Sequence, residues 1–388
     1  MARILFAWEL GEGLGHVQRL LPIALRMRSL GHDCVFAVRN IYNAHGVLGR
    51  HGFAALPGPP VQVQRSEGTT PTLADILALA GFARVDRLWP LLSAWEAIVG
   101  QVKPDLIVGD YSPGLCLAMR GGTVPVAIVG SGFTVPPESE EFPLLIEGAE
   151  RTPSGPLLAV VNEVQARRGR EPLTHLPQIF TAQARFITTL PELDRHDELR
   201  TEESRSGPLK PLPPRTNARP KVDYFAYVAL DWPKTATILE GLIKSRMKGS
   251  IYLREASPKQ VAEYREKGLV IHESPRDMEA ELANAAVLVH HCGLGTLEIG
   301  LAMGRPQMLF PRHLEQKSNA TAAARLGVSL STRARPDFTA DDVAGGLVKL
   351  RRDTQFTMRA QAQARRIAER RYADGTDRIL PVLQRLLG

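Results

Sequence analysis

The chain has 388 residues, 44% of them hydrophobic and 23% charged, which is typical of a globular protein long enough for two domains. No apolar run reaches the roughly 18 residues that span a bilayer, and acids and glycines stand near the N-terminus where a secretory signal stays apolar. We therefore expect a cytoplasmic protein. Cys34, Cys116 and Cys292 form no CxxC pair, which argues against a disulfide framework and a cysteine-based zinc site.

The net charge of +7 permits an anionic partner. Much of this charge lies in residues 359–371, RAQAQARRIAERR, which we expect to form one helix with a solvated basic face. No basic run alternates with aromatic residues, which make up 6% of the chain, so we predict no nucleic-acid partner. Attraction to a membrane surface or to a phosphorylated substrate stays open, and with it a peripheral membrane location.

The N-terminal residues predict a parallel crossover. A buried strand at 3–8 is followed by a glycine-containing loop, a helix with apolar residues at helical spacing, and a second strand at 33–38. The loop suggests a dinucleotide-binding fingerprint through Gly11 and Gly13. Its third glycine would fall at position 16, which is His16, so the fingerprint fails.

Further along, residues 72–102 have helical spacing, and two more buried strands are predicted at 105–109 and 124–129. The first of these strands is followed by Asp110 and the second by Gly130-Ser131-Gly132. Open α/β sheets bind ligands at the carboxyl ends of their strands, so both positions are candidates for a site.

Two segments interrupt the α/β pattern. Residues 133–180 are irregular and proline-rich, with one helical stretch at 157–167, and such an insertion either lines a substrate pocket or packs on a partner. Residues 201–222 are polar and proline-dense, which is typical of a linker.

After the linker the strand and helix alternation restarts, with strands expected at 224–228, 250–253 and 269–272 and helices around 235–245 and 258–267. We therefore predict an α/β protein with a first Rossmann-like domain at 1–205, a linker at 206–222 and a second Rossmann-like domain at 223–388. The last helix is a candidate to pack back on the first domain.

Residues 282–327 form the most informative stretch. The apolar run AAVLV predicts a buried strand that ends at His290-His291, a Cys292-Gly293-Leu294-Gly295 turn follows, and a helix runs on from Thr296. The next strand, QMLF, leads into a loop at 311–316. A strand, glycine turn and helix leave backbone N–H groups unpaired at the positive end of a helix, so we predict a phosphate-bearing ligand.

Several motifs together resemble one family. Pro275 lies 16 positions before His291 and is followed by three short motifs: His291-Cys292-Gly293-Leu294-Gly295-Thr296, Gly304-Arg305-Pro306 and Glu315-Gln316-Lys317-Ser318-Asn319-Ala320. The first half adds Gly15-His16 and a Lys103-Pro104-Asp105 segment that ends at Asp110. With these motifs the chain resembles the UDP-glycosyltransferase-like family. The resemblance implies the GT-B fold, in which two Rossmann-like doubly wound domains face a central cleft.

The resemblance also implies roles for individual residues. His291, Gly293, Gly295 and Thr296 would contact the diphosphate of a nucleotide-sugar donor, Glu315 and Gln316 would bind the transferred sugar, and Arg276 would lie on the donor side. His16 would be the general base, oriented by Asp110, and Gly13 and Leu14 would lie on the acceptor side. The implied activity is inverting hexosyl transfer without a metal or other cofactor.

The acceptor would be a small molecule or a lipid, shaped by segments 60–72 and 133–180. Two positions depart from the family pattern. Glu273 stands where the family has a base-stacking tryptophan, and Ile299 stands at the position of its ribose-binding glutamate, with the acid one residue earlier at Glu298. A UDP- or dTDP-linked donor is therefore preferred, with guanine open.

Simpler interpretations remain. His16 and Asp110 are also residues that cap helices, and Glu315-Gln316 is compatible with an ordinary polar loop. The pair His290-His291 does not predict a metal site, because neighbours on an extended chain point to opposite sides and no third ligand follows. The alternative functions are a non-catalytic nucleotide-sugar-binding or partner-activating relative, a sugar epimerase of the same fold, and an NADP-dependent oxidoreductase.

Overall fold

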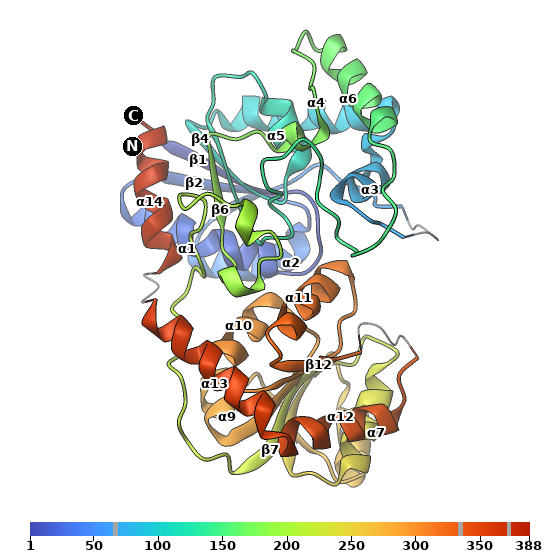
Figure 1. The fold of residues 1–388 in the computed structure, drawn as a ribbon. Coiled ribbons are helices and arrows are strands. Elements are labelled where there is room, and N and C mark those ends of the chain that lie inside the picture. Colours follow the sequence, from blue (N-terminus) through green and yellow to red (C-terminus); the bar gives the residue numbers. More distant parts are fainter. Residues whose placement is uncertain (65–68, 333–336, 371–373) are drawn as a thin grey trace. The chain divides into compact units, whose positions relative to one another are not determined.

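The computed structural model describes residues 1–64, 69–332, 337–370 and 374–388. They form two compact units, Met1–Lys210 together with Ala373–Gly388, and Pro211–Tyr372 (Figure 1). Residues 65–68 of the segment expected to shape the acceptor site, and Arg371 of the expected basic helix, lie outside the described residues.

The first unit is built on one parallel sheet with the strand order β3-β2-β1-β4-β5-β6. Its strands are β1 (Arg3–Trp8), β2 (Asp33–Val38), β3 (Ala54–Pro57), β4 (Leu106–Asp110), β5 (Val126–Gly130) and β6 (Ala184–Ile187). Its helices are α1 (Gly15–Ser29), α2 (Ile41–Leu48), α3 (Leu73–Leu77), α4 (Val85–Val102), α5 (Pro113–Met119), α6 (Gly155–Arg167) and α14 (Gly375–Leu386).

Alternation along the strands divides the core of this unit into two layers. In β1, Ile4, Phe6 and Trp8 pack on one side with α1, α2 and α14, whereas Leu5 and Ala7 pack on the other side with α3 to α6. Both faces of the sheet are therefore covered, as a parallel sheet requires.

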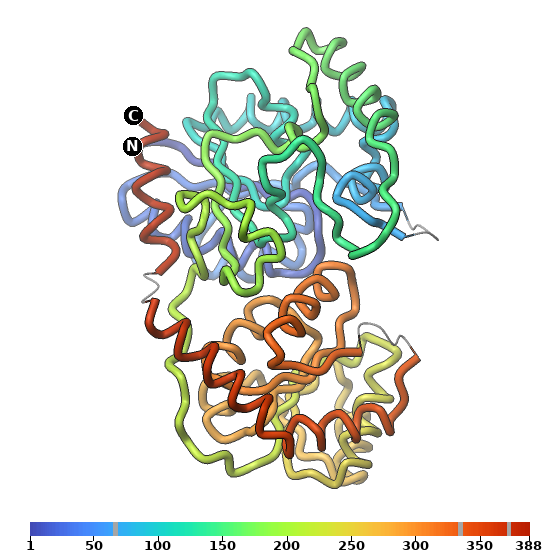
Figure 2. The backbone as a smooth tube through the Cα atoms, viewed as in Figure 1, coloured from blue at the N-terminus to red at the C-terminus, as the bar shows by residue number. Residues whose placement is uncertain are grey.

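The C-terminal helix α14 completes one of these layers. It lies beside α1, close to the N-terminus of the chain (Figures 1 and 2). Ile379 and Leu383 of α14 are buried in the layer formed with α1, and Arg26 of α1 makes a 3.0 Å ion pair with Asp377. The last residues of the chain thus belong to the core of the first unit.

The second unit repeats the architecture, with the strand order β12-β11-β10-β7-β8-β9. Its strands are β7 (Val222–Ala229), β8 (Gly249–Arg254), β9 (Val270–His272), β10 (Ala285–His290), β11 (Gln307–Leu309) and β12 (Ser329–Ser331). Its helices are α7 (Thr235–Ser245), α8 (Pro258–Glu266), α9 (Met278–Asn284), α10 (Leu294–Ala302), α11 (Leu314–Arg325), α12 (Ala340–Arg352) and α13 (Thr354–Glu369).

Numbered within its own unit, each sheet has the order 3-2-1-4-5-6 of a doubly wound Rossmann fold. The predicted α/β class with two Rossmann-like units is therefore confirmed. In sheets of this order, ligands bind beyond the carboxyl ends of the strands where the winding reverses. These switch points lie between β1 and β4 in the first unit and between β7 and β10 in the second.

The helical spacing of residues 72–102 corresponds to α3, a π-helical turn at Ala78–Phe82 and α4, with Gly81 at a φ of +98° between the two helices. One local expectation is corrected. The segment 311–316 is not wholly a loop, because α11 begins at Leu314 and puts Glu315 and Gln316 in its first turn. Within the described ranges, no helix is both long and apolar enough to cross a membrane.

Candidate functional site

In the first unit, His16 and Asp110 meet at the switch point of the sheet. Asp110 is the last residue of β4 and lies opposite Trp8, the last residue of β1. His16 is the second residue of α1, which follows the β1 loop. Its Nδ1 lies 3.1 Å from Asp110 Oδ1, and the exposed fractions of the two side chains are 7% and 0%. The two residues singled out in the sequence therefore form one buried hydrogen-bonded pair.

Arg19 is a third member of this cluster that the sequence interpretation missed. Its Nη1 donates to Asp110 Oδ2 at 2.6 Å, so the two carboxylate oxygens are held by two different residues of α1. Burial alone would raise the pKa of Asp110, but its electrostatic interactions with Arg19 and His16 and the hydrogen bonds from both outweigh this effect and hold that pKa below its ordinary value. The i, i+3 spacing of His16 and Arg19 was the available signal, because it puts both on one helix face.

Aromatic rings and a glycine enclose the His16 imidazole. The ring stacks on Trp8 at a centroid distance of 5.3 Å and on Tyr111 at 6.1 Å. Gly11 has a φ of +82°, and a Cβ there would lie 2.3 Å from Nε2 of His16. Only glycine leaves room beside that nitrogen. Gly13, with a φ of +78°, and Leu14, which precedes the first residue of α1, complete the loop.

Glu9 is a second buried acid near the pair, and nothing in the sequence pattern distinguished it. Its carboxylate accepts from the N–H groups of Gly114 and Leu115 at 2.9 and 3.0 Å and from Trp95 Nε1 at 2.6 Å. Burial raises the pKa of Glu9 to about 7, against the opposing effect of these donors and of Arg39. Glu9 thus fastens the loop that leads to His16 to the start of α5, which follows Asp110.

In the second unit, the turn after β10 is held from both sides. The Cys292 N–H donates to His290 Nδ1 at 3.1 Å, and Asn319 Nδ2 donates to the Cys292 carbonyl at 3.2 Å. Nε2 of His290 lies 2.8 Å from Gln307 Oε1, and burial lowers the pKa of His290 to about 3, so the ring is neutral. This network fixes Cys292 at a φ of +62°, an unusual value for a residue other than glycine.

His291 braces the neighbouring loops. Its Nε2 accepts from the N–H of Ala229 at 3.0 Å, which leaves the proton on Nδ1 for donation to the Phe310 carbonyl at 3.2 Å. Burial lowers the pKa of His291 to about 4. Both ring nitrogens are therefore engaged with the chain, and neither offers an N–H to a phosphate in this arrangement.

The loops after β7 and β11 are also tied together. Nη1 and Nη2 of Arg312 both donate to the Asp231 carboxylate at 2.9 Å. Trp232 packs edge-on against His291 with a centroid distance of 5.5 Å. The carboxyl edge of this sheet is thus a rigid set of loops around the start of α10.

The first turn of α10 is the part of this edge that fits an anion. Gly293 is its N-cap, and the N–H groups of Leu294, Gly295 and Thr296 lie in the turn where a helix has no internal acceptor for them. A Cβ added at Gly293 or Gly295 would meet no atom within 4 Å, so the chain itself does not require glycine at either position. Clear space beside a helix N-terminus is the arrangement in which a phosphate can approach the backbone.

The remaining residues predicted for donor binding lie in different settings. Gln316 accepts from the Arg312 N–H at 2.8 Å through Oε1, and Glu315 is half-buried beside it in the first turn of α11. Arg276 is exposed and makes a 2.8 Å ion pair with Glu281.

The two positions that depart from the family pattern are also placed. Glu273 is exposed and paired with Arg265 at 2.9 Å. Glu298 is only 5% exposed, and Ile299 packs against the apolar cluster around Phe225.

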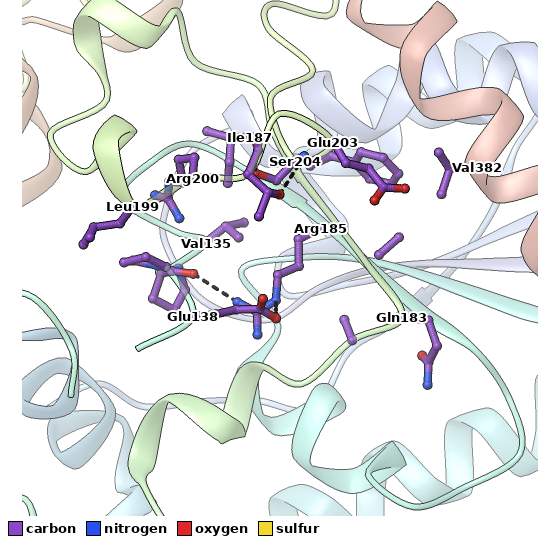
Figure 3. Close-up of a pocket in the computed structure, with 16 residues that line it drawn as sticks. Val135, Glu138, Gln183, Arg185, Ile187, Leu199, Arg200, Glu203, Ser204 and Val382 are labelled. Carbon is purple, nitrogen blue, oxygen red and sulfur yellow. Dashed lines mark hydrogen bonds and ion pairs between the residues drawn. The ribbon is translucent and has the colours of Figure 1, made fainter. Parts of the chain in front are cut away.

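The described part of the chain offers no metal site, and one pocket of the first unit has no assigned role. Among the described residues, no group of three or more His, Cys, Asp or Glu side chains is arranged to hold a metal. A pocket of about 370 Å³ lies along β6 in the first unit, near Val382 of α14 (Figure 3). Its guanidinium groups are already paired, Arg185 with Glu138 at 3.0 Å and Arg200 with Asp194 at 2.8 Å.

Comparison with known proteins identifies the fold. Neither models of protein families nor curated proteins match this sequence, but solved structures match over its whole length. The glycotransferase of kitacinnamycin has a TM-score of 0.70 and 16% identity, covering 100% of this chain and 99% of its own. The glycosyltransferase VinC in complex with dTDP has a TM-score of 0.63 and 17% identity, covering 99% of each chain.

A further match is the glycosyltransferase SsfS6 of Streptomyces sp. SF2575, complexed with thymidine diphosphate. It has a TM-score of 0.60 and 17% identity, covering 99% of this chain and 100% of its own. At such identities the likeness establishes the fold. The chain has the GT-B fold of these glycosyltransferases, as the family resemblance implied.

Proposed function

We propose that the protein is a glycosyltransferase that moves a sugar from a nucleoside-diphosphate sugar to an acceptor hydroxyl, with inversion at the anomeric carbon. The observation that carries this proposal is the buried His16–Asp110 pair at the switch point of the first sheet. A histidine that only caps a helix needs no carboxylate partner on a neighbouring strand, whereas a histidine that acts as a general base does.

His16 acts as the base in the proposed reaction. An ionised Asp110 only accepts hydrogen bonds, so Nδ1 of His16 carries its proton and Nε2 keeps its lone pair. Nε2 takes the proton of the acceptor hydroxyl as the oxygen attacks the anomeric carbon. Asp110 then stabilises the imidazolium that forms, while Arg19 keeps Asp110 ionised. The loop around Gly13 and Leu14 meets the acceptor.

The donor diphosphate binds at the first turn of α10. The N–H groups at Gly295 and Thr296, the Thr296 hydroxyl and the positive end of the helix meet the charge that develops on the leaving diphosphate. His291 acts by positioning this turn against Ala229 and Phe310 rather than by touching phosphate. With these donors the proposed mechanism needs no metal.

The remaining assignments follow from the same arrangement. Glu315 and Gln316, at the start of α11, bind hydroxyl groups of the transferred hexose, and Arg276 lies on the nucleotide side. Attack from the face opposite the diphosphate inverts the anomeric centre. A dTDP-linked donor is preferred over a UDP-linked one, because VinC and SsfS6 were solved with the thymidine nucleotide. The acceptor is a small molecule or a lipid that the cytoplasmic protein meets in solution or at a membrane surface.

Replacing the base tests this proposal. His16→Ala lowers kcat for transfer by roughly 10²–10⁴-fold, the usual contribution of a general base. Its Kd for dTDP, measured by calorimetry, stays within about twofold of wild type, because the nucleotide binds on the other unit. His45→Ala, at an exposed position of α2, is the matched control and keeps full activity.

Two results would contradict the proposal. One is full transferase activity of His16→Ala. The other is thermal stabilisation of the wild-type protein by NADP but by neither dTDP nor UDP, which would favour an oxidoreductase.

A further inference from the structure

A second pocket, of about 940 Å³, lies within the second unit between residues 216–220 and the helices α12 and α13. It reaches Ala286 at the start of β10 and Arg305 just before β11, so it is at the amino edge of the sheet. The turn at Cys292 follows the opposite end of β10, about 20 Å away for a six-residue strand. This pocket is therefore separate from the first turn of α10.

Arg305 is a buried cation without a counter-charge at this pocket. Its Nε donates to the Leu282 carbonyl at 2.8 Å, and its Nη2 donates to the carbonyls of Ala218 and Ala283 at 3.2 Å. The side chain is 4% exposed, and burial lowers its pKa without any carboxylate opposing the effect. Nη1 makes no hydrogen bond to the described residues and is not among their fully buried unpaired atoms, so it is the nitrogen that a ligand in the pocket can reach.

Four more arginines line the same pocket, Arg219, Arg351, Arg359 and Arg365. Of these four, only Arg351 has an acidic partner in the described part of the chain, Asp223 at 2.8 Å. No Asp or Glu is found among the described lining residues. The pocket in Figure 3 provides the contrast, because both of its arginines are paired with carboxylates. We call the site around Arg305 the arginine pocket.

Part of the wall of the arginine pocket is apolar. Ala286 of β10, Leu350 of α12 and Ala362 of α13 line it together with Met358, which is 59% exposed. The volume lies in the range of sites for organic ligands rather than for a single small ion. The arginine pocket therefore fits a ligand that joins an anionic head to an apolar body.

We propose that the arginine pocket binds a phosphate group carried on an apolar body, with the phosphate at Nη1 of Arg305 and between Arg219 and Arg359. Phosphate oxygens would supply the counter-charge that the chain lacks there, and guanidinium groups bind them through paired hydrogen bonds. The apolar part would lie along Met358 and Ala362 of α13. Such a phosphate belongs either to a soluble organic phosphate or to a membrane phospholipid.

The test compares binding by the full-length protein and two double variants. Arg219→Gln/Arg359→Gln removes two exposed arginines of the pocket, and Arg50→Gln/Arg87→Gln removes two exposed arginines of the first unit as the matched control. The probes are decyl phosphate, measured by calorimetry below its micellar concentration, and vesicles of phosphatidylglycerol or phosphatidylcholine, measured by co-sedimentation. Arg305→Gln is a second pocket variant, to be compared in the same way if the protein folds.

The proposal expects the pocket variant to bind decyl phosphate roughly tenfold or more weakly, whereas the control variant binds it like wild type. Loss of phosphatidylglycerol binding in the pocket variant alone assigns the phosphate to a lipid. Unchanged vesicle binding with weakened decyl phosphate binding assigns it to a soluble ligand. Equal affinities for decyl phosphate in wild type and pocket variant, or equal weakening in both double variants, would overturn the proposal.

Discussion

Replacing Arg19 with glutamine tests how the His16–Asp110 pair is tuned. The guanidinium lies 2.6 Å from Asp110 Oδ2, and its side chain is 13% exposed, so solvent screens the contact little. Asp110 is fully buried between Arg19 and His16. Removal of the fixed positive charge leaves the carboxylate with its hydrogen bond to the imidazole, and the pair then holds a proton more tightly.

The magnitude follows from the contact between one cation and one buried carboxylate. An arginine beside an aspartate lowers the pKa of the acid by about 1–3 units, and each unit corresponds to about 1.4 kcal/mol. The pKa of Asp110 is held below its ordinary value, so Arg19→Gln raises it. Because the pair must lose the proton on Nε2 before that nitrogen can accept one from the substrate, the acid limb of the pH profile moves to higher pH, by at most the about 1–3 units that apply to Asp110.

The assay is kcat/KM for transfer as a function of pH, for wild type, Arg19→Gln and Arg26→Gln. Arg26 lies on the same helix, and its partner Asp377 is 50% exposed, so its removal should leave the acid limb in place. Affinity for dTDP should be the same in all three proteins. The reasoning is wrong if the acid limb of Arg19→Gln coincides with that of wild type.

Two further substitutions probe the loop that carries His16. Glu9→Gln should remove a pH dependence of the free energy of unfolding. The folded state favours neutral Glu9, because its pKa is raised from 4.5 to about 7. As the pH rises between these values, wild type should therefore lose about 3 kcal/mol of unfolding free energy relative to Glu9→Gln. Urea denaturation at a series of pH values measures this, and parallel curves would contradict it. Gly11→Ala should lower the rate of transfer at least about 100-fold without weakening dTDP binding. The alanine Cβ would lie 2.3 Å from His16 Nε2, and the residue would have a φ of +82°. A wild-type kcat in this variant would show that Nε2 is not the reacting atom.

The sequence predicted the architecture well where patterns are strong. Buried strands such as 33–38 and the helix at 235–245 were placed at their observed bounds, because apolar spacing and flanking glycines determine them. The edge strands β3 and β6 were not predicted. Each has four residues, and β3 ends at Pro57, so local pattern alone does not distinguish them from loops.

The site residues that belong to short sequence motifs were predictable, whereas the contacts that join residues of neighbouring strands were not. The Gly15-His16 motif and Asp110 could be singled out from the resemblance. Glu9 could not, because its donors lie at Gly114 and Leu115 and only the adjacency of β1 and β4 brings them together. The engagement of both His291 nitrogens likewise depends on Ala229 and Phe310, which reach it from neighbouring strands.

The most direct test of the proposed donor site is the affinity for dTDP of wild type and Gly295→Asp. A side chain at position 295 would enter open space, and an acid in the first turn of a helix favours the helix, so the thermal stability of the variant should equal or exceed that of wild type. The same carboxylate would occupy the place proposed for the diphosphate and repel it. The account predicts a folded Gly295→Asp protein that binds dTDP roughly 100-fold or more weakly. Wild-type affinity in the folded variant would contradict it.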